Sequence, residues 1–136
     1  MIKEIIHNPM QLSQPSQQAS RADLPIATDL LDTLSAHKEN CVGMAANMIG
    51  QPKRIIAVAM GMTNVAMINP EIIAHSSPYE TKEGCLSLTG QRPTRRFHQI
   101  TVRFRNLDWQ LTTLQLTDWV AEIVQHEVDH CNGVLI

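Results

Sequence analysis

The sequence has 136 residues, a hydrophobic fraction of 43% and a formal net charge of −2 at pH 7. A chain of this length can bury roughly two thirds of its unfolded surface, so we expect a single domain over residues 1–136. The nearly balanced charge argues against a nucleic-acid partner or a polybasic membrane surface, and no apolar run reaches the roughly 18 residues of a membrane span. Residues 1–7 also lack the apolar segment and cleavage site of a secretory signal, so we expect a cytoplasmic protein.

The first third of the chain predicts an irregular arm, a helix and a turn. Residues 8–22 are rich in Gln, Ser and Pro, which is typical of irregular backbone. An Asp and a Pro typical of a helix start come next, and apolar residues then recur every three or four positions, which predicts a helix over 23–38. The small residues of 42–46 predict a turn.

Short strands and one further helix are expected in the rest of the chain. β-Branched or alternating segments predict strands over residues 54–59, 65–68, 71–74, 100–104 and 112–116. Asn69-Pro70 is expected to end the second strand, and the last two are expected to form a hairpin. Thr117 or Asp118 is expected to cap a final helix. Few connections are long enough for crossovers, so we expect an α+β domain with antiparallel strands around the C-terminal helix.

The final helix carries the strongest chemical signal, His126-Glu127-Val128-Asp129-His130. In this H-E-x-x-H pattern, helical spacing places both imidazoles on one face, one turn apart, where they can bind a single metal ion. Glu127 lies near the same position, where a general base is needed. By itself the pattern is equally compatible with two unrelated surface histidines.

A catalytic metal site needs a third protein ligand, and the best candidate is Cys85. Cys85 lies in the segment Glu83-Gly84-Cys85-Leu86-Ser87, where glycine allows a close backbone approach. One thiolate and two imidazoles suit iron(II), zinc, cobalt or nickel. Cys41 is a weaker candidate. Cys131 directly follows His130, so it points about 100° away on the helix and is expected to pack in the core.

Three segments together resemble the signature motifs of the peptide deformylase family: Gly43-Met44-Ala45-Ala46-Asn47-Met48-Ile49-Gly50, Glu83-Gly84-Cys85-Leu86-Ser87, and Gln125-His126-Glu127-Val128-Asp129-His130. The resemblance implies a metallohydrolase that removes the formyl group from N-formylmethionyl peptides at the start of nascent chains. It implies one divalent metal ion on Cys85, His126 and His130, and Glu127 as the general base. The ion is expected to be Fe(II) in the cell, with zinc, nickel or cobalt as substitutes in a purified sample.

The first motif departs from the family pattern at two positions, Cys41 and Met48. The family has Gly at the first, and at the second a Gln whose amide stabilises the formyl oxygen together with the backbone N–H at Leu86. A methionine thioether cannot donate a hydrogen bond. Loss of one such donor costs on the order of 2.7–4 kcal/mol, or roughly 10²–10³ in rate. We therefore predict impaired or altered activity.

The remaining site residues are predicted from the resemblance and from helical spacing. The resemblance implies that Val42 and Gly43 pair with the substrate backbone and that Arg92 contacts substrate; a tight turn and a surface charge are the competing interpretations. By the same analogy, Arg96 is expected to pair with Glu83 or Asp129. Trp119 and Ile123, seven and three residues before His126, share its helix face and are candidates for the pocket wall, or for plain core packing.

Two other functions remain open on the sequence. A protein of the same fold that binds N-terminal peptides without turnover is favoured by Met48 and Cys41, whereas Glu127 argues against it. A general H-E-x-x-H metalloprotease is disfavoured because the residues after His130 offer no third His or Glu ligand. The sequence is compatible with a monomer or a homodimer.

Overall fold

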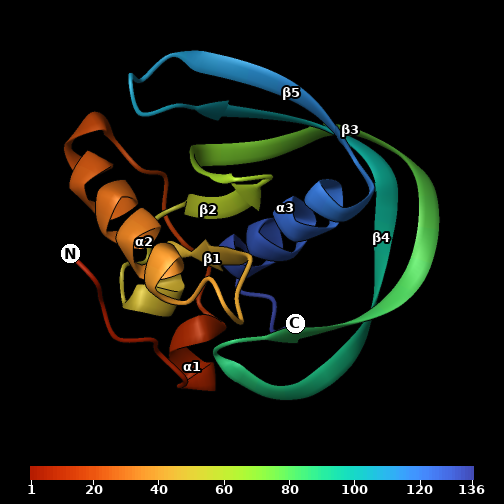
Figure 1. Cartoon of the computed structure of the whole chain (residues 1–136), viewed down its shortest axis with the longest axis horizontal. Coiled ribbons are helices and arrows are strands. Elements are labelled where there is room, and N and C mark those ends of the chain that lie inside the picture. The colour runs from red at the N-terminus through yellow and green to blue at the C-terminus, as the bar shows by residue number, and fades with distance from the viewer.

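The computed structural model describes residues 1–136 and shows one antiparallel sheet with helices on both of its faces (Figure 1). In chain order the elements are α1 (Pro9–Leu12), the 3₁₀ helix η1 (Arg21–Asp23), α2 (Leu24–Ala36), β1 (Gly43–Ala45), the 3₁₀ helix η2 (Ala46–Ile49), β2 (Ile55–Met60), β3 (Thr63–Cys85), β4 (Leu88–Arg105), β5 (Leu111–Thr117) and α3 (Asp118–Cys131). The strands lie in the order β1-β2-β3-β4-β5, and every neighbouring pair is antiparallel. The expected α+β class with antiparallel strands around the C-terminal helix is confirmed.

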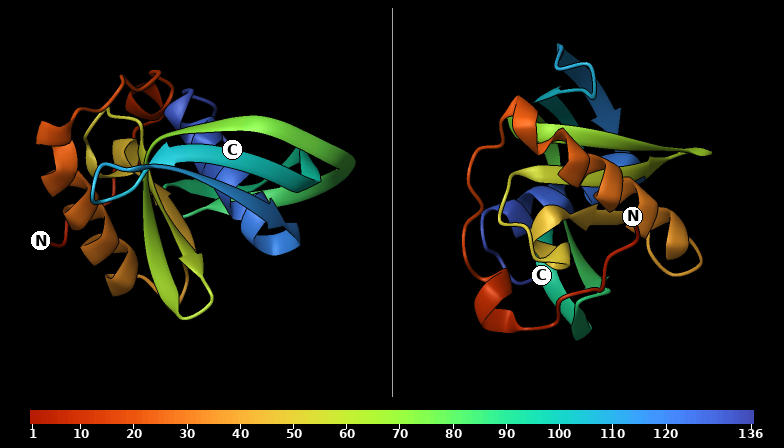
Figure 2. Two further views of the ribbon diagram at one scale, coloured as in Figure 1. Left: turned by 90° about the horizontal axis from the view of Figure 1, so that it is seen from above. Right: turned by 90° about the vertical axis from the view of Figure 1, so that its left-hand side faces the viewer.

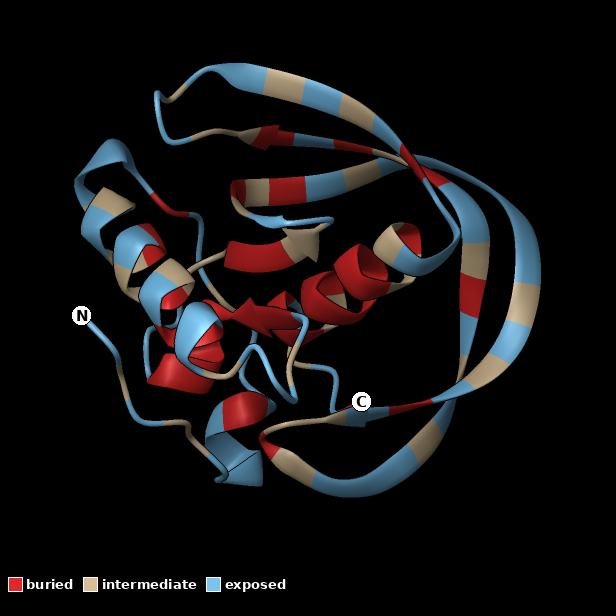
Figure 3. Ribbon diagram, viewed as in Figure 1, coloured by how far each residue is buried: buried red, intermediate tan, exposed pale blue.

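The strand β2 separates two hydrophobic cores. Successive side chains of a strand point to opposite faces of the sheet. Ile55 and Ala57 accordingly join the core under α2, whereas Ile56 and Val58 join the core around α3. Figure 3 shows the consequence: α2 is buried along one side, whereas α3 is buried around most of its circumference. The helix that carries the H-E-x-x-H pattern is therefore held from several directions.

The long hairpin β3–β4 corrects the predicted strands of this region. The sequence predicted separate strands over 65–68 and 71–74 with a stop at Asn69-Pro70, but β3 runs through this point for 23 residues. Its register against β4 shifts twice between Ile68 and Ala74. Such bulges bend a strand without ending it. The hairpin consequently arches around α3, as Figures 1 and 2 show.

A second correction concerns residues 42–46, which were predicted to form a turn. Residues 43–45 form the short edge strand β1, with Gly43 opposite Val58 and Ala45 opposite Ile56 on β2. Three residues are too few to show an alternating pattern, and their strand conformation is set by pairing with β2. Because β1 lies at the edge of the sheet, its other side has no strand partner.

The irregular arm predicted over residues 8–22 is wrong in part, because Pro9–Leu12 form the short helix α1, whose first turn is capped by the Asn8 side chain accepting from the Met10 N–H. The other predicted helices and strands are confirmed with small shifts in their ends. The helix predicted over 23–38 is α2 preceded by η1, and the hairpin predicted over 100–104 and 112–116 lies within β4 and β5. Thr117 precedes α3 as its N-terminal capping residue, in extended conformation. None of the helices combines the length and the apolar character needed to cross a lipid bilayer.

Candidate metal centre

Three donor atoms converge where the end of β3 meets the last turns of α3. The Sγ atom of Cys85 and one ring nitrogen each of His126 and His130 lie within 4.8 Å of one another. Sγ is 3.3 Å from Nε2 of His130, and the two Nε2 atoms are 3.1 Å apart. His126 and His130 are buried, and Cys85 is partly buried. The structure thus brings together the three residues that the sequence predicted as ligands.

A buried ion-pair network orients the ring of His126. Its Nδ1 lies 2.8 Å from Oε1 of Glu83, so Nε2 faces the other two donors. The guanidinium of Arg96 donates to both oxygens of Glu83, at 2.7 and 3.0 Å, and to Oδ2 of Asp129 at 2.7 Å. The expected contact of Arg96 with Glu83 or Asp129 is confirmed, and it reaches both carboxylates.

The pKa values of the two imidazoles are shifted in opposite directions. Burial disfavours the charged form of His126, but hydrogen bonds with Cys85 and Glu83 outweigh this effect and raise its pKa to about 10. Burial, reinforced by the charge on His126, lowers the pKa of His130 to about 3. Burial also opposes the charge on Glu83, yet the hydrogen bonds from His126 and Arg96 hold its pKa well below the usual range. A cation bound at the three donors must therefore displace a proton from His126.

The donor set fits one divalent transition-metal ion. A thiolate and two imidazoles are ligands for iron, cobalt, nickel and zinc, and three protein ligands leave a position for water or substrate. The Nδ1 atom of His130 is buried without a hydrogen-bond partner, and its low pKa keeps the ring neutral, as a metal ligand requires. Glu83 on His126 supplies the outer hydrogen bond that metal-bound histidines commonly have.

Glu127 is buried against β1 beside the three donors. It is 4% exposed, its Oε1 has no hydrogen-bond partner, and burial is the main cause that raises its pKa to about 7. A carboxylate with a pKa near neutrality can both accept and return a proton. Gly43 makes room for it, because a Cβ at this position would lie 2.8 Å from Oε2 of Glu127 and 2.7 Å from Cγ2 of Ile123.

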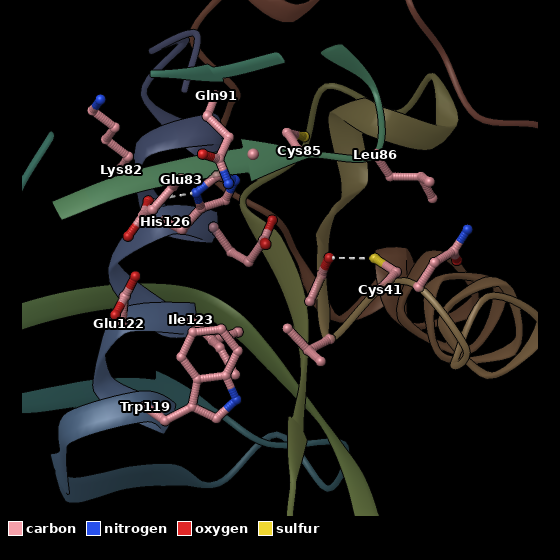
Figure 4. A pocket seen from close by; sticks show the side chains of 15 residues that line it. Cys41, Lys82, Glu83, Cys85, Leu86, Gln91, Trp119, Glu122, Ile123 and His126 are labelled. Atoms are coloured by element: carbon pink, nitrogen blue, oxygen red, sulfur yellow. Dashed lines mark hydrogen bonds and ion pairs between the residues drawn. The ribbon is translucent and has the colours of Figure 1, made fainter. Parts of the chain in front are cut away.

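A cavity of about 250 Å³ opens next to the donors. Figure 4 shows its two sides, with Trp119, Glu122, Ile123 and His126 projecting from α3 and Cys41 and Leu86 lying opposite. Trp119 is 59% exposed at the rim, whereas Ile123 is 4% exposed. Both residues predicted as pocket wall therefore line the cavity.

Leu86 and Met48 occupy different environments. Leu86 lines the cavity, and its backbone N–H donates no hydrogen bond within the protein. Met48 lies in η2, is 1% exposed and packs in the core under α2. Its sulfur accepts a hydrogen bond from the Ala45 N–H at 3.5 Å, and its side chain is not part of the cavity lining. Of the two positions, only Leu86 presents a donor to the cavity.

Val42 and Gly43 lie at the cavity, whereas Arg92 does not line it. Val42 and Gly43 precede and begin the edge strand β1, and the Val42 carbonyl accepts from the Ala59 N–H at 2.8 Å. Nη1 of Arg92 donates to the Thr89 carbonyl at 3.0 Å. Its Nε and Nη2 atoms are buried without partners, so most of this guanidinium is free to donate to another group.

Neither of the other cysteines belongs to the three-donor cluster. Cys41 lines the cavity and donates to the Gly43 carbonyl at 3.0 Å. Burial raises its pKa to about 11, so the group remains a thiol near neutral pH. Cys131 is fully buried in the core around α3, as its place on the helix predicted.

Two contacts at the site were missed from the sequence. The Tyr79 hydroxyl donates to Oε1 of Glu122 at 2.9 Å, and the Asn47 amide donates to the His130 carbonyl at 2.9 Å. Tyr79 lies four residues before Glu83, so strand spacing would have placed both on one face had the full length of β3 been recognised. No sequence signal pointed to the Asn47 contact, which joins η2 to the end of α3.

Fold and site together define a class of protein. Two histidines and a carboxylate on a buried helix, a thiol from a neighbouring strand and an adjacent cavity form the arrangement of a metal-dependent hydrolase.

Comparison with known proteins gives the family. A family model described as polypeptide deformylase matches residues 2–136. A peptide deformylase of Clostridium beijerinckii is 43% identical over 136 residues, which is 100% of both chains, and one of Dictyoglomus thermophilum is 38% identical over 82% of this chain and 72% of its own. The chain belongs to the peptide deformylase family.

Solved structures agree with this assignment. The Met-Ala-Ser-bound crystal structure of a class I type b peptide deformylase from Acinetobacter baumannii has a TM-score of 0.88 at 29% identity, covering 99% of this chain and 97% of that chain. The deformylase of the Vibrio parahaemolyticus bacteriophage VP16T, in complex with actinonin, has a TM-score of 0.87 at 28% identity over 98% and 99% of the two chains. The fold of this chain is thus that of the peptide deformylases.

Proposed function

We propose that this chain hydrolyses the formyl group from N-formylmethionyl peptides at the start of nascent chains, with one divalent metal ion held by Cys85, His126 and His130. The convergence of these three donors within 4.8 Å, beside a cavity, is the observation that carries the proposal. The tripeptide Met-Ala-Ser bound to the Acinetobacter baumannii relative supports a ligand that begins with methionine. Fe(II) is the ion we expect in the cell, with zinc, nickel or cobalt in a purified sample.

The chain's own residues supply proton transfer and orientation. When bound, the ion acts as a Lewis acid that makes water more acidic and the formyl carbonyl more electrophilic. Glu127 accepts a proton from the attacking water and returns it to the leaving amine, which its pKa of about 7 allows. The backbone at Val42 and Gly43, at the open edge of the sheet, pairs with the peptide. The free Leu86 N–H donates to the formyl oxygen as negative charge develops there.

Two further positions bear on rate and affinity. Met48 supplies no hydrogen-bond donor, and its buried sulfur is directed to the Ala45 N–H. We therefore propose turnover below that of a site with a second donor, by roughly 10²–10³. Arg92, with two unpartnered nitrogen atoms, is proposed to contact the peptide after its side chain turns towards the cavity.

A second candidate function is peptide binding without turnover, and Met48 is the observation that favours it. It predicts tight binding of Met-Ala peptides with no release of formate. The buried Glu127 at the cavity favours hydrolysis instead, because a binding protein has no need of a base with a pKa near neutrality.

The test is hydrolysis by anaerobically purified protein whose metal content has been measured. Formyl-Met-Ala should be cleaved and acetyl-Met-Ala should not. Glu127→Ala should lower the turnover number by roughly 10²–10⁴ because proton transfer is lost, whereas its metal content should equal that of the wild type. Peptide binding without formate release in the iron-loaded wild type would overturn the first proposal in favour of the second.

A further inference from the structure

The two histidines of the metal centre differ in what supports the ring nitrogen that faces away from the other donors. Nδ1 of His126 lies 2.8 Å from Oε1 of Glu83. Nδ1 of His130 is buried and has no hydrogen-bond partner in the protein. Metal-bound histidines almost always donate this second N–H to an acceptor, which fixes the tautomer and the direction of the ring. His130 therefore requires an acceptor other than Glu83.

The tautomer of His130 follows from the position of its other ring nitrogen. Nε2 faces the cluster, 3.3 Å from Sγ of Cys85 and 3.1 Å from Nε2 of His126. A neutral imidazole carries one proton, so a ring that binds an ion through Nε2 carries its proton on Nδ1. In His130 this N–H is a buried donor, and a buried donor without an acceptor costs free energy.

Asn47 offers the matching acceptor. It lies in η2 and is 6% exposed, and its Nδ2 donates to the His130 carbonyl at 2.9 Å and to the Leu12 carbonyl at 3.5 Å. Because the NH₂ end of the amide faces these carbonyls, its Oδ1 is the acceptor end, and this atom is buried without a partner. An unpaired buried acceptor and an unpaired buried donor thus belong to two residues that are already joined by a hydrogen bond.

We propose that Asn47 is a positioning residue for the metal ion and that it acts through His130. Its Oδ1 accepts a hydrogen bond from the His130 Nδ1–H, directly or through one buried water molecule that has polar partners on both sides. This bond keeps Nε2 of His130 directed towards Cys85 and His126. Asn47 does not line the cavity, so its effect on turnover is indirect. The inference rests on the proposed function, because it needs the ion on the three donors.

Two serines are competing partners for the same N–H. The Oγ atoms of Ser16 and Ser87 are also buried without a partner, and Ser87 lies two residues after Cys85. The backbone of Ser16 reaches the end of α3, where its N–H donates to the Cys131 carbonyl at 2.8 Å. Asn47 is favoured because it alone among these three residues forms a hydrogen bond with His130 itself.

Zinc affinity, measured by competition with a chelator, separates the acceptor role of Asn47 from a purely structural one. Asn47→Leu replaces the amide by an apolar group of similar size, so zinc affinity should fall by about 10–100-fold. Asn47→Asp keeps an acceptor for His130 but cannot donate to the two carbonyls. It should therefore lose stability in urea, as Asn47→Leu does, and still bind zinc more tightly than Asn47→Leu.

Asn69→Gly is the matched control. The Asn69 side chain also joins two segments, through hydrogen bonds of 2.8 and 2.9 Å with the Ala19 backbone, and its φ of 54° suits glycine. This variant should lose stability in urea, because both hydrogen bonds are removed, with no change in zinc affinity.

Nuclear magnetic resonance of the zinc-loaded wild type observes the hydrogen bond itself and does not require an Asn47 variant to fold. The proton on His130 Nδ1 should be detected, exchange slowly with solvent and show a nuclear Overhauser contact with the Asn47 side-chain amide. Ser16→Ala and Ser87→Ala should leave this proton protected from exchange.

Three results would overturn the inference. These are wild-type zinc affinity in Asn47→Leu, equal losses of zinc affinity in Asn47→Leu and Asn47→Asp, and a His130 Nδ1 proton that loses its protection in either serine variant. Failure of the proposed function is distinguishable from all three. A zinc-loaded wild type that does not cleave formyl-Met-Ala would overturn the proposed function alone, whereas a wild type that binds no zinc would overturn both.

Discussion

The site has two halves, and their polar side chains differ in how many of their hydrogen-bonding groups have a partner within the protein. On the side of the metal donors, His126 is held by Glu83, Glu83 by Arg96, and Arg96 also by Asp129, at distances of 2.7 to 3.0 Å. On the side of the substrate, Met48 is directed into the core and Arg92 keeps two unpartnered nitrogens.

The two halves of the site correspond to two different requirements of a metallohydrolase, binding of the ion and recognition of the peptide. Ligands for an ion must be fixed before the ion arrives, and the buried network around His126 does so. Groups that recognise a peptide need free hydrogen-bonding capacity, which the second half retains. The donor absent at Met48 affects only the second half. We therefore expect full metal binding together with altered peptide turnover, and the following predictions test this separation from the largest expected effect to the smallest.

The largest expected effect is on the pH dependence of metal binding. His126 has a pKa of about 10 in the ion-free protein, so at lower pH it must release its proton to become a ligand. Affinity should therefore rise with pH, by at least about tenfold per unit or about 100-fold between roughly pH 6 and pH 8. His130, with a pKa of about 3, is already neutral in this range and adds no proton. Zinc titration against a chelator at both pH values measures the slope; an affinity independent of pH would contradict it.

The second largest expected effect is the loss of stability and of metal affinity caused by Arg96→Gln in the metal-binding half. It breaks a buried ion pair whose side chains are 5% and 7% exposed, which should lower the free energy of unfolding by about 3–5 kcal/mol. Because Glu83 would then be less firmly held against His126, metal affinity should fall by about 10–100-fold.

Arg103→Gln is the matched control for Arg96→Gln. Arg103 pairs with Glu71 at 3.2 Å, with side chains 43% and 64% exposed. An exposed pair of this kind contributes about 0–1 kcal/mol. Urea denaturation and zinc titration of both variants measure the contrast, and equal effects would show that the network around Glu83 has no special role.

The smallest expected effect is a gain in the substrate half from Met48→Gln. A glutamine amide that turns from the core towards the cavity adds a second donor for the formyl oxygen, and turnover of formyl-Met-Ala should then rise at least about tenfold. Metal affinity should not change, since Met48 is not one of the three donors. Steady-state kinetics of both proteins at equal metal content measure the gain. An unchanged rate would show that position 48 is irrelevant to catalysis in this chain.

The metal donors could be predicted from the sequence because their signals are local or motif-based. Helical spacing alone puts His126 and His130 on one face, and Cys85 follows from the search for a third ligand and from the family motif. The arching hairpin β3–β4 could not be predicted, because bulges after Ile68 carry the strand through Asn69-Pro70, where local propensity indicates an end. Because the prediction lacked this hairpin, it also missed the position of Tyr79 on the same strand face as Glu83.

By itself the sequence determined the α+β class and the final helix, and it predicted the three candidate metal ligands, because these depend on periodicity, on residue chemistry and on the family motifs. Only the tertiary structure decided that Met48 packs inward, that Gly43 lies against Glu127, and that Tyr79 meets Glu122. Such contacts join residues 43 to 84 positions apart in the chain, or depend on the direction of one side chain. They are fixed by packing between elements, which no local pattern records.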